Sequence, residues 1–146
     1  MRTASLFLLP AACVLLLGCD QPLKAYRSPD DLAPVRQAAA VIAEGTLAVV
    51  NEGDHHPLPE EYWSLEGDMG YRCVVELKNA LKLTRAVKGV AAPADSLAFW
   101  YFAPCVRSEP LGNVEVTSRI LKPGDRLRVY LEKRGDKYWL IGHEKL

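Results

Sequence analysis

The chain has 146 residues, and its 18 lysine and arginine side chains balance its 18 aspartate and glutamate side chains. Domains that bind nucleic acids concentrate basic residues on one face, whereas here the signs alternate, as at Glu132, Lys133, Arg134 and Asp136. We therefore expect a solvated surface and no nucleic-acid partner. With 49% apolar residues, the chain is long enough for one domain with a well-formed core and too short for a second.

The first residues have the layout of a secretory signal. Arg2 is followed by an apolar stretch over residues 4–17, in which Cys13 is the only ionisable side chain. A membrane-spanning helix needs about 20 apolar residues, but this stretch is shorter, contains Pro10 and ends at Cys19. We therefore expect residues 1–18 to be an export signal that is removed.

The residues before Cys19 are Leu16, Leu17 and Gly18, which resemble the lipobox of bacterial lipoproteins. The resemblance implies that diacylglycerol is attached to the Cys19 sulfur, that the chain is cleaved before it, and that the new amine is acylated. Two or three acyl chains would hold the protein on a membrane permanently. Asp20 resembles an inner-membrane retention signal, so the expected location is the cell envelope, facing the periplasm. The alternatives are an ordinary signal peptide, cleaved nearby, and an N-terminal segment of the core.

A polar, proline-containing segment follows the lipobox. Residues 19–28 predict an extended, lipidated tether, and residues 29–146 predict the single folded domain. Ser28 can cap a short helix in which Pro29 takes the first position. We expect this helix to end before Pro34 or to be distorted by it.

The clearest strands form a hairpin at the C-terminal end. Apolar and polar residues alternate over residues 126–131, Arg134 and Gly135 permit a tight reversal, and residues 138–143 return as the partner strand.

Two more strands are predicted in the middle of the chain. Residues 71–78 alternate with period two, and this strand is expected to continue toward Leu83. Residues 96–104 form a continuous apolar and aromatic run, which is typical of a strand buried on both faces. A short strand around Val114 and Val116 is also expected.

The segment before these strands is harder to assign. Residues 39–50 are rich in valine, isoleucine and threonine toward their end, which predicts a strand broken at Gly45, although a helix through Ala43 is an alternative. Residues 51–70 contain three glycines, two prolines and six acidic residues without apolar periodicity, so we predict a long exposed loop.

About five strands in one domain predict a mainly β fold, a small OB-like antiparallel barrel with a short N-terminal helix. The segments AVIAEGTL, YRCVVELKNALKLTRAVKG, SLAFWYFAPC and LKPGDRLRVYLEKRGDKYWLI resemble the OB-type barrel of the netrin and tissue-inhibitor-of-metalloproteinase class. Its marks are a GT, a KG, and a PGD that leads to a YL strand. Those inhibitors act through a free N-terminal cysteine amine, so acylation of Cys19 would exclude that activity here.

Cys73 and Cys105 are the cysteines left once Cys13 leaves with the signal and Cys19 carries lipid. Export to an oxidising compartment favours a disulfide between them, which would close a loop of about 32 residues. Two buried free thiols that act as small apolar side chains are the alternative. We do not expect a redox-active pair, because there is no CxxC spacing.

A cluster of side chains with metal-binding groups surrounds His55 and His56. Imidazole nitrogens and carboxylate oxygens bind zinc and copper, and the acidic members are Glu52, Asp54, Glu60 and Glu61. Adjacent histidines point in different directions in an extended chain, so a tight site needs ligands from elsewhere, such as His143. The alternative interpretation is a solvated acidic loop.

Aromatic residues suggest a binding surface. Trp100, Tyr101 and Phe102 are consecutive, so at least one ring faces away from any single core. An exposed ring on an OB barrel can stack on a sugar or pack against a protein partner. The alternative is that barrel core and helix cover both faces of this strand. Tyr62 and Trp63, in the predicted loop, form a second candidate patch.

The sequence contains no recognisable catalytic or cofactor motif. No serine lies in a GxSxG turn, no glycine-rich phosphate loop is present, and paired carboxylates such as Glu60 and Glu61 fall on exposed segments. We therefore expect a membrane-anchored, non-enzymatic binding or scaffold module without a cofactor, which serves an envelope protein or a glycan. The alternative function is a metal-binding lipoprotein that uses His55 and His56.

Overall fold

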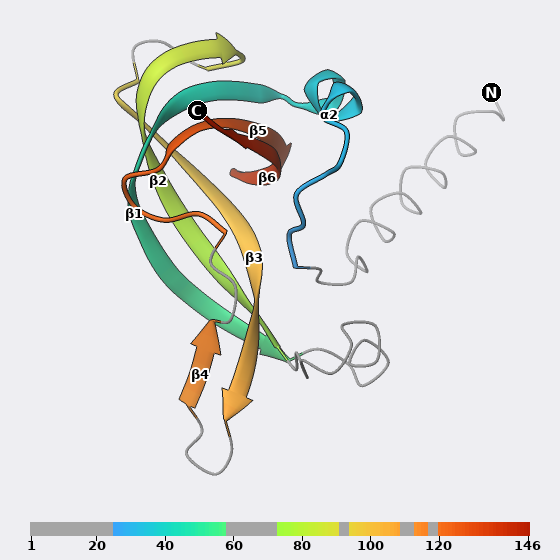
Figure 1. Cartoon of the computed structure of the whole chain (residues 1–146), viewed down its shortest axis with the longest axis vertical. Helices are drawn as coiled ribbons and strands as arrows, with labels where there is room; N and C mark the ends of the chain where they lie inside the picture. The colour runs from blue at the N-terminus through green and yellow to red at the C-terminus, as the bar shows by residue number, and fades with distance from the viewer. Residues whose placement is uncertain (1–24, 58–72, 91–93, 109–112, 117–119) are drawn as a thin grey trace, which may run out of the picture.

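The computed structural model describes residues 25–57, 73–90, 94–108, 113–116 and 120–146. Strands dominate this part of the chain (Figure 1). No helix within the described ranges is long and apolar enough to cross a membrane. In chain order the elements are α2 (Ala33–Ala38), β1 (Val41–Pro57), β2 (Cys73–Lys88), β3 (Ser96–Ser108), β4 (Asn113–Val116), β5 (Arg126–Arg134) and β6 (Lys137–Lys145).

Five of these strands form a closed ring. β1 pairs with β2 and with β5, β2 pairs with β3, and β5 pairs with β6. The ring closes where β3 pairs with β6, at Trp100 and Trp139, while β4 is added at the far end of β3 (Figure 1). The predicted fold class is confirmed: the chain is mainly β, with a small five-stranded OB-like barrel and one short helix.

The barrel is mixed, so the prediction of a wholly antiparallel barrel is wrong in one pairing. β3 and β6 run parallel, whereas the other neighbours are antiparallel. The reason is geometric, because strand directions cannot alternate around a closed ring with an odd number of members. The alternation therefore fails at one pairing, which is the closing contact.

The core lies inside the ring because alternate side chains on each strand point inward. On β3, Phe99 and Tyr101 are buried, whereas Trp100 and Phe102 lie on the outer side and are partly exposed. The run over residues 96–104 is therefore buried on one face only, whereas its composition predicted burial on both faces. The largest fully buried side chains are Tyr101, Tyr130, Phe99, Leu47, Leu77, Leu81, Leu121, Leu127, Leu131, Val74, Val75 and Val129.

β1 is longer and more continuous than predicted. It passes through Gly45 with a shift of register against β2 at that point, so the alternative of a helix through Ala43 is wrong. A Cβ atom at residue 45 would lie 2.2 Å from the Lys82 carbonyl oxygen. Glycine at this position therefore allows β1 and β2 to approach closely without breaking the strand.

The predicted loop over residues 51–70 is also corrected in its first part. Residues 51–57 belong to β1 and pair with β2, with His55 opposite Val75 and His56 opposite Val74. Charged and polar residues are tolerated in this stretch because its side chains are mostly exposed while β2 pairs its backbone. The remainder of the predicted loop, with Tyr62 and Trp63, lies outside the described residues.

α2 begins later than predicted. Leu32 precedes the helix and Pro34 lies in its first turn, whereas Ser28 and Pro29 lie outside it. Proline has no backbone N–H and is tolerated in a first turn but not in a helix interior, so Pro34 marks the start and not the end. The helix is joined to the barrel by a small apolar cluster made of Leu32, Val35, Ala39, Ile42, Tyr130 and Ile141.

Cys73 and Cys105 lie directly opposite each other on β2 and β3 and are disulfide-bonded. Their Cα atoms are 5.1 Å apart, and both side chains are buried. Of the two alternatives that the sequence leaves open, the structure has the disulfide and not the pair of free thiols.

Replacement of Cys73 and Cys105 by serine should destabilise the protein. The cross-link spans 32 residues, and a loop of this length restricts the unfolded chain by about 3–4 kcal/mol. Denaturant unfolding of the double variant, compared with the oxidised protein, measures this difference. Equal stability of the oxidised and the double-serine protein would contradict a disulfide in the native protein.

Candidate functional site

Three aromatic side chains meet on the outer surface of the closing contact. Trp100 and Phe102 come from β3 and Trp139 from β6; we call these three residues the aromatic row. The Phe102 and Trp139 rings are stacked, with centroids 5.0 Å apart and an angle of 21° between their planes. Trp100 is the register partner of Trp139 across the parallel pairing. All three side chains are partly exposed, so the row is an outer surface and not part of the core.

Cationic side chains lie over the rings of the row. The Lys78 ammonium is 5.5 Å from the Trp100 ring centroid, and the Lys137 ammonium is 5.3 Å from Trp100 and 5.9 Å from Trp139. The Arg134 guanidinium is 5.8 Å from Trp139. Such cation–π contacts hold both partners in place. Lys137 and Arg134 are also ion-paired, with Glu76 and Glu132 respectively.

Glu76 is an acidic residue beside the row. It lies on β2 opposite Phe102, and its Oε1 atom accepts a hydrogen bond of 2.8 Å from the Lys137 ammonium. Both side chains are partly buried, which makes this ion pair stronger than one fully in water. Lys137 therefore links a carboxylate on β2 to both tryptophans of the row.

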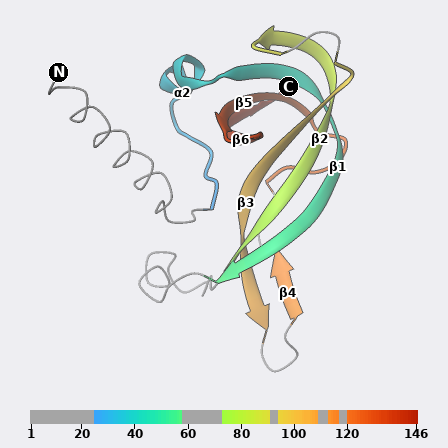
Figure 2. The same cartoon turned by 180° about the vertical axis from the view of Figure 1, so that it is seen from behind.

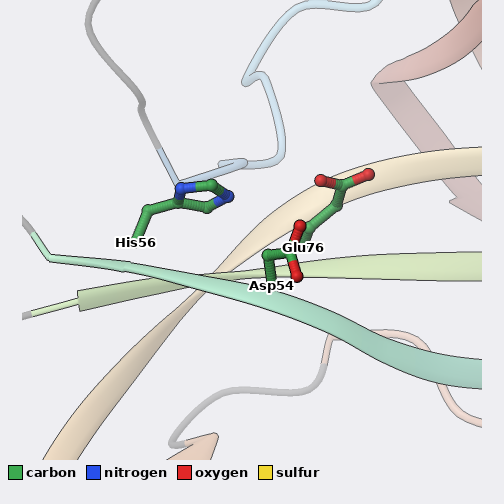
Figure 3. A group of neighbouring side chains, drawn as sticks. All are labelled: Asp54, His56 and Glu76. Atoms are coloured by element: carbon green, nitrogen blue, oxygen red, sulfur yellow. The ribbon is translucent and has the colours of Figure 1, made fainter.

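Next to Glu76, two side chains from the end of β1 complete a group of potential ligands. The donor atoms of Asp54, His56 and Glu76 all lie within 4.8 Å of one another. Figure 3 shows Asp54 and His56 on β1 and Glu76 on β2, with the three side chains on the same side of the two strands. The edge of the His56 ring also faces Phe102, at 5.8 Å between centroids. The group therefore borders the aromatic row.

The structure separates the two histidines that the sequence placed together. His56 belongs to the group with Asp54 and Glu76, and His55 does not. His143, the suggested additional ligand, is instead hydrogen-bonded through Nδ1 to the Tyr26 hydroxyl at 2.7 Å. Cys19, Tyr62 and Trp63, the other candidate residues, lie outside the described residues.

The segment before α2 contacts the barrel at Tyr26. The Tyr26 N–H donates a hydrogen bond of 2.7 Å to the Phe102 carbonyl, and Figures 1 and 2 show this segment passing beside β3. Burial raises the pKa of Tyr26 to about 12, and burial lowers the pKa of His143. Both shifts favour the neutral forms of the two side chains in this hydrogen bond.

A separate ion-pair network ties β1, β5 and β6 together. Arg128 donates to Glu44 at 2.6 and 2.8 Å and to Glu144 at 3.0 Å, and the Tyr130 hydroxyl donates to Glu144 at 2.6 Å. The hydrogen bond from Tyr130, followed by the Arg128 charge, lowers the pKa of Glu144. These groups satisfy one another's hydrogen-bonding capacity and fix the register of the strands, so the network is structural.

Sequence reasoning missed Trp139, Glu76 and Lys137. Trp139 lies between Tyr138 and Leu140, which pack on the core, so alternation already placed its ring on the other face of β6. Nothing in the sequence showed that this face would adjoin β3. The signal for Glu76 was similar, because it is an outward position in the alternating strand that starts near Cys73.

The fold and the site define a small mainly β protein with an OB-like barrel and an exposed aromatic surface at its closing contact. No family model, curated protein or solved structure matches the chain.

Proposed function

We propose that the protein is a membrane-anchored, non-enzymatic binding module that holds a glycan on the aromatic row. The observation that carries this proposal is the row itself. Three aromatic rings from two strands are grouped on the outside of the barrel, with two of them stacked, although the core does not require them there. Grouped, partly exposed aromatic side chains are typical of binding surfaces.

The groups around the rings can hydrogen-bond the hydroxyl groups of a glycan. A sugar presents C–H faces that stack on aromatic rings and hydroxyl groups that need donors and acceptors at the ring edges. Lys78 and Lys137 supply donors and positive charge, and Glu76 supplies an acceptor. OB barrels bind oligosaccharides on the face of their second and third strands, and β3 carries two of the three rings while β2 carries Lys78 and Glu76, which supports the proposal by analogy of fold.

The proposal includes the lipid anchor on Cys19, removal of residues 1–18, and a barrel of the netrin and tissue-inhibitor class. About seven residues separate Cys19 from Tyr26, and at about 3.3–3.6 Å per residue they reach no further than roughly 25 Å. Because Tyr26 is hydrogen-bonded to Phe102, a lipid on Cys19 would keep the aromatic row near the membrane surface. Asp20 favours the inner membrane, so the ligand would belong to the periplasmic side.

Replacement of Cys19 by serine tests the anchor. The variant should keep its signal and lose lipidation, because serine has no thiol to form the thioether. The expected result is a mass without acyl chains and altered partition into detergent, with globomycin producing the same block in the wild type. Cys13→Ser, a cysteine within the signal, is the matched control and should be processed normally. Unchanged processing and partition of Cys19→Ser would refute the anchor.

Replacement of Trp139 by alanine tests the binding surface. In the mature protein, purified in detergent, we expect affinity for soluble peptidoglycan fragments to fall by about 2 kcal/mol, roughly thirtyfold, because a stacking ring is lost. Isothermal titration calorimetry measures the change. Trp139→Phe should retain most of the affinity.

The control for this measurement is Val87→Ala, which changes a similarly apolar side chain that is 45% exposed near the other end of β2. It should leave the affinity unchanged. If the wild type binds no glycan, or if Trp139→Ala binds as tightly as Val87→Ala, the glycan proposal is wrong. Recovery of a protein that depends on Trp139, without any glycan binding, would assign the row to a protein partner instead.

A further inference from the structure

The second feature of this outer surface is the group formed by Asp54, His56 and Glu76 (Figure 3). Its members come from adjacent strands, and their donor atoms already lie within 4.8 Å of one another. Ligand atoms bonded to a tetrahedral zinc ion at about 2.0–2.2 Å are separated from one another by roughly 3.3–3.6 Å. Small rotations of side chains that are exposed or partly exposed would therefore bring all three donors onto one ion.

Backbone geometry explains why these side chains converge. Asp54 and His56 are two residues apart on β1, and a register shift between Glu52 and His55 bulges the strand at this point. A Cβ atom at Gly53 would lie 3.1 Å from the Glu76 carbonyl oxygen, so a glycine here allows the bulge to pack closely on Glu76. The paired backbones of β1 and β2 thus fix the positions of the three ligand-bearing residues.

We infer that Asp54, His56 and Glu76 bind a divalent cation of the zinc type, with the remaining coordination position open to water or to a ligand. One imidazole nitrogen with two carboxylate oxygens suits zinc and neighbouring first-row ions, whereas calcium and magnesium prefer oxygen ligands alone. The site differs from the one expected from sequence, because it uses His56 without His55 and recruits Glu76 from a distant part of the chain. It does not depend on glycan binding.

Lys137 links the proposed site to the aromatic row, because it contacts both. Its ammonium is 2.8 Å from the Glu76 carboxylate, to which the metal ion would also bind. A bound cation would repel this ammonium and weaken its bond to Glu76. Since the same ammonium lies over Trp100 and Trp139, occupation of the site would alter the surroundings of both rings.

The test uses zinc alone, titrated by calorimetry into the mature protein in detergent. We expect His56→Ala to weaken binding by at least about tenfold, since even partners outside the coordination sphere contribute roughly 10- to 100-fold. His55→Ala is the matched control: it removes an adjacent histidine on the same strand that is outside the group, and it should leave the affinity unchanged. Lys137→Met should increase the affinity because it removes the competing cation.

Tryptophan fluorescence supplies the second measurement. In a Trp63→Phe background only Trp100 and Trp139 report, and zinc should change their emission; His56→Ala should abolish this change. Three results would each overturn the inference. They are no zinc binding by the wild type, an equal loss of zinc affinity in His55→Ala and His56→Ala, and a lower zinc affinity in Lys137→Met. Thermal unfolding of every variant separates loss of the site from loss of the fold. Because no glycan is present, failure here leaves the glycan proposal unaffected.

Discussion

The parallel contact between β3 and β6 is the constraint on which the rest of the structure depends. The other pairings of the ring are antiparallel, and without this one the barrel would be an open sheet with the edges of β3 and β6 unpaired. Closure buries the inward side chains of all five strands in a single core. It also sets Trp139 against Trp100 and Phe102, residues that are far apart in the sequence.

The proposed glycan surface and the proposed metal site both follow from that closure. Closing the ring sets Lys137, the first residue of β6, beside Glu76 on β2 and over the tryptophans. The Lys137–Glu76 ion pair is therefore a shared element, since it borders the aromatic row and competes for a proposed ligand of the cation. Because Lys137 contacts both the aromatic row and the proposed metal site, binding at one would alter binding at the other.

Local patterns predicted much of the fold. Alternation marked β2, the apolar run marked β3, and the hairpin of β5 and β6 was recognisable from its period and its turn at Gly135. The errors arose where tertiary pairing decided the outcome, as in residues 51–57, which are strand because β2 pairs with them despite their polar composition. Part of the candidate site was likewise visible, because Trp100, Phe102, Asp54 and His56 could be singled out from the sequence. Trp139, Glu76 and Lys137 could not, because their place in the site depends on the strand pairing that closes the ring.

The most direct test of the account is a nuclear Overhauser measurement on the mature protein in detergent, between the ring protons of Trp139 and those of Phe102. The rings are stacked with centroids 5.0 Å apart, so cross-peaks between them are expected, together with those of the β5–β6 hairpin. Hairpin cross-peaks without any contact from Trp139 to β3 would show an open sheet. The aromatic row would then not exist as a surface, and the account would be wrong at its centre.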